Sequence, residues 1–274
     1  MINMPPSRDH AEVDLGTAAG VTDRGLRHQR NEDAMDLASQ RTPDGLVVVA
    51  VVCDGVSSSP RGDEASQAAA QAALPVLLVA VQEGGDLAEA SRAAVMAGRQ
   101  SVAALQEPAH DTSATTFLSV VARPHDVTLC WLGDSRAYWL AQPASESLQL
   151  TRDDSVAGGM IEAGLASEEA AMASPHAHVL TRWLGAEAAD LSDDPARAPH
   201  VERYSPTGTG VLLACSDGLW NYLPEAADLA QLALPKALTD PLGAAVDMVQ
   251  FAVDAGGADN ITTVLIQYPL PQAP

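Results

Sequence analysis

The stretch LVVVAVVCDG, residues 46–55, is a run of aliphatic residues that ends on the carboxylate of Asp54. Three other acidic residues stand at the ends of similar apolar runs: Asp134 follows residues 127–132, Asp217 follows residues 211–215, and Asp259 precedes residues 261–266. Short β-branched or aliphatic runs bounded by turn residues are typical of buried strands. The chain therefore predicts at least four core strands, each with a carboxylate at one end.

These four carboxylates need a partner, because an unpaired charge is costly to bury. A shared cation or a ring of basic side chains would supply one, and the sequence contains no such basic ring. A metal site is therefore the simplest explanation. Carboxylates without a cluster of cysteines or histidines favour a hard, oxygen-seeking ion, Mg²⁺ or Mn²⁺, over zinc.

The histidines and cysteines show no pattern typical of a metal site. His176 and His178 are two residues apart, and we interpret them as a pair on a surface loop rather than as ligands. The three cysteines, Cys53, Cys130 and Cys215, fall in predicted strands and form no C-x-x-C pair. We expect them to be buried free thiols.

Length and composition suit one domain. The chain has 274 residues, of which 47% are hydrophobic and only 4% aromatic, so its core must consist mainly of Ala, Val and Leu. We expect a single domain over residues 1–274, with an ordered core of about residues 14–268. The two ends, including the proline-rich residues 269–274, are expected to be frayed.

The net charge of −21 excludes several kinds of partner. Proteins that bind nucleic acids or anionic membranes present basic faces. We therefore expect neither a nucleic acid nor an anionic membrane as a partner of this protein. The apolar stretches are interrupted before the roughly 18 residues that a membrane helix needs. The N-terminal residues lack the features of a signal peptide. We therefore expect a cytoplasmic protein, and a monomer.

The order of the elements predicts the fold class. Strands are expected near residues 16–21, 46–53, 115–122, 127–132, 137–140, 148–150, 211–215 and 260–268. Helices are expected at residues 63–80, with a kink or break at Pro75, and at residues 87–105, 225–234 and 241–255. Residues 154–172 carry a helical pattern broken by glycines, which indicates a mobile flap. Because the strands do not alternate strictly with helices, we predict an α+β fold with mainly antiparallel sheets.

Phosphoester hydrolysis is the chemistry that the carboxylates favour. Paired divalent cations held by shared carboxylates activate water and bind phosphoryl oxygens, as in hydrolytic phosphatases. The sequence has no Walker loop, no Rossmann glycine pattern and no G-x-S-x-G elbow. Ser135 follows Asp134, but no histidine stands in an obvious partner role for a serine nucleophile.

Ten short motifs occur in a defined order along the chain. They are residues 22–25 (TDRG), 31–33 (NED), 52–55 (VCDG), 62–66 (GDEAS), 113–116 (SATT), 133–138 (GDSRAY), 150–153 (LTRD), 180–185 (LTRWLG), 215–219 (CSDGL) and 259–262 (DNIT). In this order they resemble the motif series of the metal-dependent type 2C serine/threonine protein phosphatases, most closely the bacterial branch. The resemblance spans roughly residues 16–267, and although each motif alone is weak, ten in register are specific.

The resemblance implies both a fold and a metal centre. The fold is a four-layer α-β-β-α sandwich, in which two stacked, mainly antiparallel sheets are flanked by antiparallel helix pairs. The centre is binuclear and holds Mg²⁺ or Mn²⁺. Asp54 would bridge the two ions, the carbonyl of Gly55 would bind one of them, and Asp217 and Asp259 would bind the other. Asp54, Asp217 and Asp259 are therefore the expected catalytic residues.

Further acidic residues have roles implied by the same resemblance. Glu32 and Asp33 would hold metal-bound waters without touching the ions. Asp134, together with Asp217, would match the weaker third metal site of bacterial members. Simpler roles also fit these residues: Asp54, Asp217 and Asp259 as turn residues at strand ends, Asp134 as a partner of Arg136, and Glu32 as a helix or turn cap.

The chain departs from the family pattern near the expected substrate site. Bacterial members usually continue the Asp-Gly motif with two glycines and often a histidine, whereas residues 56–62 read VSSSPRG, a stiffer loop with three hydroxyls. The family's phosphate-binding arginine falls at His28, which Arg27 and Arg30 flank. Either His28 or a neighbouring arginine, such as Arg27, is then expected to bind phosphate. Asp154 also replaces a histidine that is common after the motif aspartate.

Three functions fit these observations. The first is a signalling phosphatase that dephosphorylates phosphoserine and phosphothreonine in substrates of a serine/threonine kinase. The second is a catalytically weak or dead regulatory or binding module, and the third is a hydrolase of small phosphorylated metabolites. Retention of Asp54, Asp217 and Asp259 favours an active enzyme, because a binding module has no need of a costly carboxylate cluster.

Overall fold

Residues 46–54 form most of β4 (Gly45–Asp54), and the side chains of this strand alternate between two cores. The odd-numbered side chains of residues 47–53 lie in a cluster beneath a helix pair. The even-numbered side chains of residues 48–52 lie in a second cluster between the two sheets. Because both faces of β4 are covered, the strand has no polar face, which explains its unbroken apolar run.

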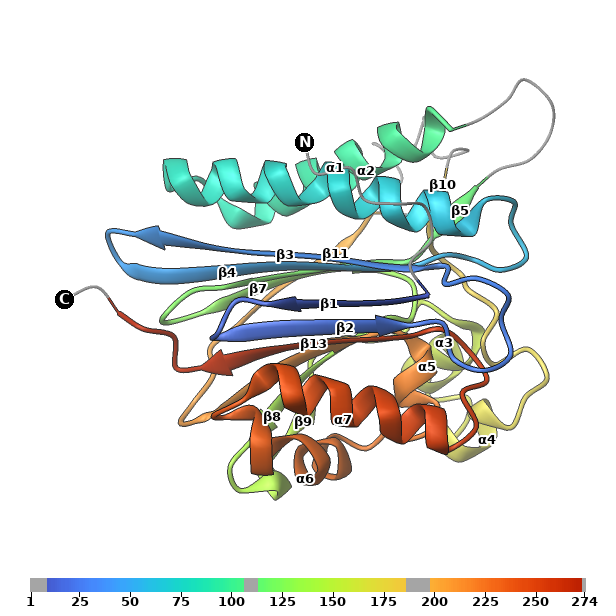
Figure 1. Cartoon of the computed structure of the whole chain (residues 1–274). Coiled ribbons are helices and arrows are strands. Elements are labelled where there is room, and N and C mark those ends of the chain that lie inside the picture. The colour runs from blue at the N-terminus through green and yellow to red at the C-terminus, as the bar shows by residue number, and fades with distance from the viewer. Residues whose placement is uncertain (1–8, 106–112, 186–197, 273–274) are drawn as a thin grey trace.

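The computed structural model describes residues 9–105, 113–185 and 198–272, which form four layers (Figure 1). A helix pair, a five-stranded sheet, a six-stranded sheet and a second helix pair follow one another. Every strand pairing within the described residues is antiparallel. The predicted α+β sandwich is therefore confirmed.

The two sheets bring together strands from both halves of the chain. The five-stranded sheet has the order β11-β7-β6-β4-β3, with β3 (Asp33–Thr42), β6 (Phe117–Ala122), β7 (Val127–Leu132) and β11 (His200–Tyr204). The six-stranded sheet has the order β1-β2-β13-β12-β8-β9, with β1 (His10–Asp14), β2 (Ala18–Asp23), β8 (Arg136–Ala141), β9 (Leu148–Gln149), β12 (Gly210–Cys215) and β13 (Ile261–Tyr268). A third, two-stranded sheet pairs β5 (Ala114–Thr115) with β10 (Leu184–Gly185).

The helices form the outer layers. α1 (Gly62–Glu83) and α2 (Leu87–Ala103) cover the five-stranded sheet, whereas α6 (Ala226–Ala237) and α7 (Pro241–Asp254) cover the six-stranded sheet. α1 buries small side chains at helical spacing, namely those of Ala65, Ala69 and Ala73. A core built from alanine and aliphatic residues therefore needs few aromatic ones, as the composition predicts.

We predicted a kink or a break at Pro75, and the break is wrong, because α1 continues through this residue as one helix. Proline cannot donate the hydrogen bond that the carbonyl of Gln71 would accept. Both Gln71 and Pro75 lie on the exposed side of the helix, so that water can satisfy this carbonyl.

α1 is also long and apolar enough to cross a membrane by length and composition, contrary to our reading of the apolar stretches. Its buried alanines and leucines belong to the cluster between the helix pair and the five-stranded sheet. The apolar character of α1 thus has an explanation within the fold.

The strands that we did not predict lie mostly at sheet edges. β1, β3 and β11 each form one edge of a sheet. β1 and the second half of β3 alternate between more and less exposed residues, and no residue of β11 is buried. Because an edge strand keeps a solvated face, it carries polar residues that hide it in the sequence. Residues 10–14, which we expected to be frayed, pair with β2 in full register.

The C-terminal residues also depart from our expectation of a frayed tail. Leu270 is 2% exposed and packs in the core between the sheets. The amide of Leu46 donates a hydrogen bond of 2.8 Å to the carbonyl of Pro271. The ordered part of the chain therefore extends past residue 268.

The predicted flap forms two short helices, α3 (Val156–Glu162) and α4 (Glu168–Met172), which contact each other, and another short helix, α5 (Asp217–Trp220), follows β12 (Figure 1). The flap has a small core of its own, in which Ala157, Ala171 and Ala177 are buried. The segment is thus ordered locally, but it shares little apolar surface with the main cores. Its movement is still a prediction.

Candidate metal centre

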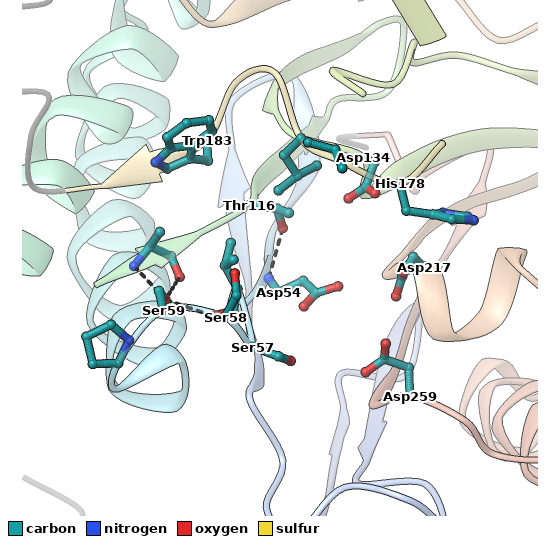
Figure 2. A pocket seen from close by; sticks show the side chains of 16 residues that line it. Asp54, Ser57, Ser58, Ser59, Thr116, Asp134, His178, Trp183, Asp217 and Asp259 are labelled. Atoms are coloured by element: carbon teal, nitrogen blue, oxygen red, sulfur yellow. Dashed lines mark hydrogen bonds between the residues drawn. The ribbon is translucent and has the colours of Figure 1, made fainter. Parts of the chain in front are cut away.

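The four carboxylates that end the predicted strands meet at one end of the sandwich (Figure 2). Asp54 ends β4 in the five-stranded sheet, whereas Asp217 follows β12 and Asp259 precedes β13 in the six-stranded sheet. Asp134 lies in the turn from β7 to β8, which joins the two sheets. Because both sheets contribute, the cluster forms only when they stack.

All four carboxylates line one cavity of about 620 Å³. Its other walls come from the loop after β4, from the strand β5 region and from the end of the flap. The remaining lining residues are Gly55, residues 56–60, Ala114, Thr116, residues 178–180 and Trp183.

Asp54 is positioned by its backbone. Its amide donates a hydrogen bond of 2.9 Å to Thr116 Oγ1 (Figure 2). Thr116 Oγ1 in turn lies 2.8 Å from Ser135 Oγ. Ser135 is 2% exposed and is therefore a structural partner of Thr116, in agreement with our rejection of a serine nucleophile. Gly55 cannot be replaced easily, because a Cβ atom there would lie 2.4 Å from the carbonyl oxygen of Gly62.

Asp217 and Asp259 approach the cavity from the six-stranded sheet. Asn221 donates a hydrogen bond of 3.1 Å to Asp217 Oδ2, but the buried Oδ1 atom has no hydrogen-bond partner among the described residues. Asp259 Oδ1 accepts from the amide of Asn260 at 2.8 Å and lies 3.1 Å from Nε2 of His28. Asp217 therefore keeps a free, desolvated oxygen at the cavity.

Asp134 is 6% exposed and does not pair with Arg136, so the simpler role that we considered for it is wrong. The Arg136 guanidinium instead donates two hydrogen bonds to Asp153, at 2.9 and 2.8 Å, and lies 3.7 Å above the ring of Trp220. Trp220 Nε1 donates to the backbone carbonyl of Asp134 at 3.0 Å. The turn is thus fixed by its backbone, which leaves the carboxylate at the cavity.

Glu32 and Asp33 lie behind the four carboxylates. Glu32 Oε2 accepts a hydrogen bond of 2.9 Å from Ser57, in the loop that departs from the family pattern. Asp33 pairs in register with Asp54, and its Oδ2 accepts hydrogen bonds of 2.7 Å from Ser216 and Thr262. Asp33 Oδ1 is buried with no hydrogen-bond partner among the described residues.

Burial and mutual repulsion make this cluster hard to ionise. Burial, followed by the charges of neighbouring carboxylates, raises the pKa of Asp54 and that of Asp217 well above the usual range. Burial is also the main cause that raises the pKa of Asp33 to about 6 and that of Asp134 to about 7. The carboxylates therefore lack enough nearby positive charge to stabilise their ionised forms at neutral pH.

These donors fit hard divalent cations. Carboxylate oxygens are the ligands that Mg²⁺ and Mn²⁺ prefer. The free Oδ1 atoms of Asp217 and Asp33 are buried polar atoms that a bound ion, or water on it, would satisfy. An ion would also remove the repulsion that raises the pKa values. A divalent cation would thus provide a partner for the buried oxygen atoms and also reduce the repulsion among the carboxylates.

The candidate phosphate-binding residues lie beside the cavity rather than in its lining. His28 is 25% exposed and touches Asp259, whereas Arg27 is exposed on the surface. Arg30 forms an ion pair with Asp63, in which Nη1 lies 3.2 Å from Oδ2. Of these residues, His28 is therefore the one in contact with the carboxylate cluster.

Our sequence analysis missed several residues of the site. A ring nitrogen of His178, which we interpreted as part of a surface pair, lies with carboxylate oxygens of Asp134 and Asp217 inside a group whose atoms are all within 4.8 Å of one another. Trp183 is 45% exposed and lines the same cavity. Asn260 accepts a hydrogen bond from the amide of Glu32 at 2.7 Å, which ties β13 to the NED motif.

Comparisons with known proteins agree with this geometry. The chain matches the family model described as Protein phosphatase 2C over residues 24–242. It is 28% identical over 249 residues to the serine/threonine protein phosphatase PstP of Mycobacterium tuberculosis. That match covers 90% of this chain and 44% of the relative, so the chain spans less than half of the relative's length.

Solved structures are similar over nearly the whole chain. The PPM Ser-Thr phosphatase MsPP from Mycobacterium smegmatis, in complex with cacodylate, is 30% identical with a TM-score of 0.71, and the match covers 93% of this chain and 99% of that one. The catalytic domain of PstP in complex with two manganese ions is 25% identical with a TM-score of 0.69, and the match covers 91% and 96% of the two chains.

Proposed function

Because this chain belongs to the protein phosphatase 2C family, we propose that it removes phosphate from phosphoserine and phosphothreonine residues of proteins. The observation that carries the proposal is the convergence of Asp54, Asp217 and Asp259, from two sheets, on one cavity. The named relatives, which are serine/threonine phosphatases, support the substrate class.

We assign the metal ligands as the resemblance implies. Asp54 would contribute to holding both ions, the carbonyl of Gly55 would hold one of them, and Asp217 and Asp259 would hold the other. When bound, Mg²⁺ or Mn²⁺ supplies an activated water molecule and positive charge for the phosphoryl oxygens. The structure of PstP with two manganese ions supports this choice of ion.

The protein's own part is to hold and orient these groups. Thr116 fixes the backbone of Asp54, and Ser57 holds the carboxylate of Glu32. We assign to Glu32 and Asp33 the positioning of water around the ions, for which Asp33 offers its free Oδ1 atom. Such outer contacts keep ligands in a fixed geometry.

The two alternatives differ from this proposal in what the cavity does. A catalytically dead module would bear the repulsion among buried carboxylates without any benefit from it. A hydrolase of small metabolites would use the same ions but would gain nothing from exposed side chains around the site. Trp183 and Val179, which are 45% and 52% exposed, both line the cavity and offer apolar contacts to a polypeptide.

Turnover of two substrates separates these functions. With Mn²⁺, we expect phosphoserine and phosphothreonine peptides to be hydrolysed with a higher kcat/KM than a small aryl phosphate, and a chelator should abolish both reactions. Hydrolysis of the aryl phosphate and of small phosphorylated metabolites without peptide turnover would indicate a metabolite hydrolase. Lack of all turnover with Mn²⁺ bound would indicate a binding module.

We further propose the setting in which this activity occurs. The substrates are proteins phosphorylated by a serine/threonine kinase, and the enzyme is a cytoplasmic monomer with a single domain that takes part in signalling. The net charge of −21 supports the absence of nucleic acid and of an anionic membrane among its partners.

His28 rather than Arg27 is proposed to bind the substrate phosphate, because it contacts Asp259 at 3.1 Å. A guanidinium binds phosphate through two parallel hydrogen bonds, whereas an imidazole offers at most one donor per nitrogen. We therefore expect KM for a phosphopeptide to be lower in His28→Arg than in the wild type.

Arg27→Ala provides the matched control for this prediction, because Arg27 is the exposed neighbour of His28. We expect its KM to stay within about twofold of the wild type, as for most surface substitutions. If Arg27→Ala instead raises KM tenfold and His28→Arg leaves KM unchanged, then Arg27 binds the phosphate.

A further inference from the structure

Asp154, which stands where the family commonly has a histidine, lies at the base of the flap. The amide of Thr181 donates a hydrogen bond of 2.8 Å to the carbonyl of Asp154, and Ser155 and Leu180 form an antiparallel bridge beside this contact. The two ends of the flap thus pair with each other, and Asp154 is the residue at which the chain enters the flap.

The backbone and the side chain of Asp154 both bind the turn that carries Asp134. The amide of Asp154 donates to the carbonyl of Gly133 at 2.9 Å, and the amide of Gly133 donates to Asp154 Oδ2 at 3.1 Å. Gly133 has a φ of +102°, and a Cβ atom there would lie 2.7 Å from Cγ2 of Thr116. Because Thr116 accepts a hydrogen bond from the amide of Asp54, one glycine links Asp154 to the residues around the metal centre.

The second carboxylate oxygen of Asp154 meets two basic side chains. His200 Nε2 lies 2.9 Å from Asp154 Oδ1 and 2.7 Å from Arg182 Nη1, and this Nη1 atom lies 3.4 Å from the same Oδ1. Nε2 either donates to Asp154 or accepts from Arg182, and in both cases the ion pair between Asp154 and Arg182 completes the group. The Asp154 side chain is only 8% exposed, so that water screens this ion pair less than one on the surface.

The two basic residues connect Asp154 to two further parts of the fold. His200 begins β11, and its ring stacks on that of Trp131 in β7, with centroids 4.6 Å apart and an interplanar angle of 19°. Arg182 lies in the segment that leaves the flap, and it directly precedes Trp183, which lines the cavity. The carboxylate of Asp154 therefore joins the five-stranded sheet to the cavity wall formed by the end of the flap.

We propose that Asp154, held by Arg182 and His200, is a positioning residue that fixes the flap-side wall of the cavity for a polypeptide substrate. We call these three residues the flap clasp. The flap has only a small core of its own, so that polar contacts at its base determine where it lies. The inference rests on the proposed function, because it concerns how the same cavity receives its substrate.

The wall that the flap clasp positions lies away from the metal ligands of the six-stranded sheet. Figure 2 shows Trp183 on the opposite side of the cavity from Asp217 and Asp259. A small aryl phosphate held at the carboxylates has no chain to lay against this wall, whereas a phosphopeptide carries flanking residues that need a surface in a fixed place. Loss of the clasp should therefore weaken binding of peptides more than that of aryl phosphates.

Substitutions that remove the ion pair of the clasp from either side test the proposal. Asp154→Asn keeps an oxygen for the amide of Gly133 but loses the negative charge that pairs with Arg182. Arg182→Gln removes the same ion pair from the other side, and the double variant completes a cycle. Arg152→Gln is the matched control, because Arg152 also pairs with a flap residue, Glu162, and with β11, but is 61% exposed.

Steady-state kinetics with Mn²⁺ give the first readout, as the ratio of kcat/KM for a phosphothreonine peptide to that for a small aryl phosphate. We expect this ratio to fall at least about fivefold in Asp154→Asn and in Arg182→Gln, through a higher peptide KM, and no further in the double variant, because both substitutions break one contact. Arg152→Gln should stay within about twofold of the wild type. An equal loss on both substrates would overturn the proposal, because the clasp would then act on the metal centre and not on the wall.

Proteolysis with a glutamate-specific protease gives a second readout that does not depend on catalysis. The flap contains Glu168 and Glu169, both of which are exposed. Cleavage follows the population of the opened flap, so it should be about fivefold faster in Asp154→Asn and Arg182→Gln than in the wild type and Arg152→Gln. Equal cleavage rates in all four proteins would overturn the flap clasp, whatever the kinetics show.

The two readouts separate this inference from the proposed function. Faster flap cleavage in Asp154→Asn, in a protein that hydrolyses no phosphopeptide, would support the clasp and contradict the phosphatase activity. Phosphopeptide hydrolysis by the wild type, with KM and flap cleavage unchanged in Asp154→Asn, would overturn the clasp alone.

Discussion

Replacing Asp54 with asparagine is expected to lower phosphopeptide hydrolysis by at least about a hundredfold. Loss of a contact outside the metal ligands typically costs 10- to 100-fold in activity or metal affinity, and Asp54 is assigned to both ions directly. The variant should still fold, because the amide of Asp54, which donates to Thr116, is unchanged. The measurement is kcat for a phosphothreonine peptide at saturating Mn²⁺, with circular dichroism to check the fold.

The same variant should be more stable than the wild type when metal is removed. The pKa of Asp54 is raised by burial and by the charges of Asp33, Asp217, Asp134 and Asp259, so that a neutral amide relieves a repulsion. We therefore expect a higher Tm for Asp54→Asn in a chelator and a smaller gain on adding Mn²⁺.

Asp36→Asn is the matched control for Asp54→Asn. Asp36 is a partly buried carboxylate on the neighbouring strand β3, and burial raises its pKa as well, but it does not line the cavity. We expect its kcat to stay within about twofold of the wild type. If Asp54→Asn retains more than about a tenth of wild-type turnover, the two-ion assignment fails.

Metal binding is expected to raise the stability of the protein by about 3 kcal/mol at a hundredfold excess of Mn²⁺ over its Kd, because the ions bind only the folded state. The effect should be largest near neutral pH, where the empty carboxylate cluster repels itself most. Thermal melts with Mn²⁺ and with a chelator, over about pH 4 to 8, measure it.

The pH dependence of the metal-free protein has a defined sign. The folded state holds the pKa of Asp33 at about 6 and that of Asp134 at about 7, above their ordinary value of 3.8. Between about pH 4 and pH 7 the unfolded chain therefore loses protons that the folded chain keeps, and the free energy of unfolding falls as pH rises. Mn²⁺ should abolish this fall. Identical melts with Mn²⁺ and chelator at pH 7.5 would mean that the cluster binds no ion.

Much of the fold follows from the sequence because local pattern reports burial. β4 is unbroken in its apolar character because both of its faces are covered, and the alanines of α1 recur at the spacing of a helix face. We did not predict β1, β3 and β11, because an edge strand has a solvated face and its mixture of polar and apolar residues interrupts the apolar run.

The carboxylates of the site were also visible in the sequence. Asp54, Asp134, Asp217 and Asp259 each stand where a buried strand ends, and a charge at such a position needs a partner wherever the strand lies. The sequence therefore predicted a shared cation site and named the four carboxylates that the fold brings to one cavity. It did not determine which neighbours complete the site.

Those neighbours were decided by the tertiary structure alone. Arg136 is two residues from Asp134 in the sequence but binds Asp153, because β8 turns its side chain onto Trp220. His178 lies near Asp134 and Asp217 only because the end of the flap forms part of the cavity wall. Such contacts join residues that are far apart in the chain, and their geometry depends on how whole layers pack, which no local period or spacing of residues records.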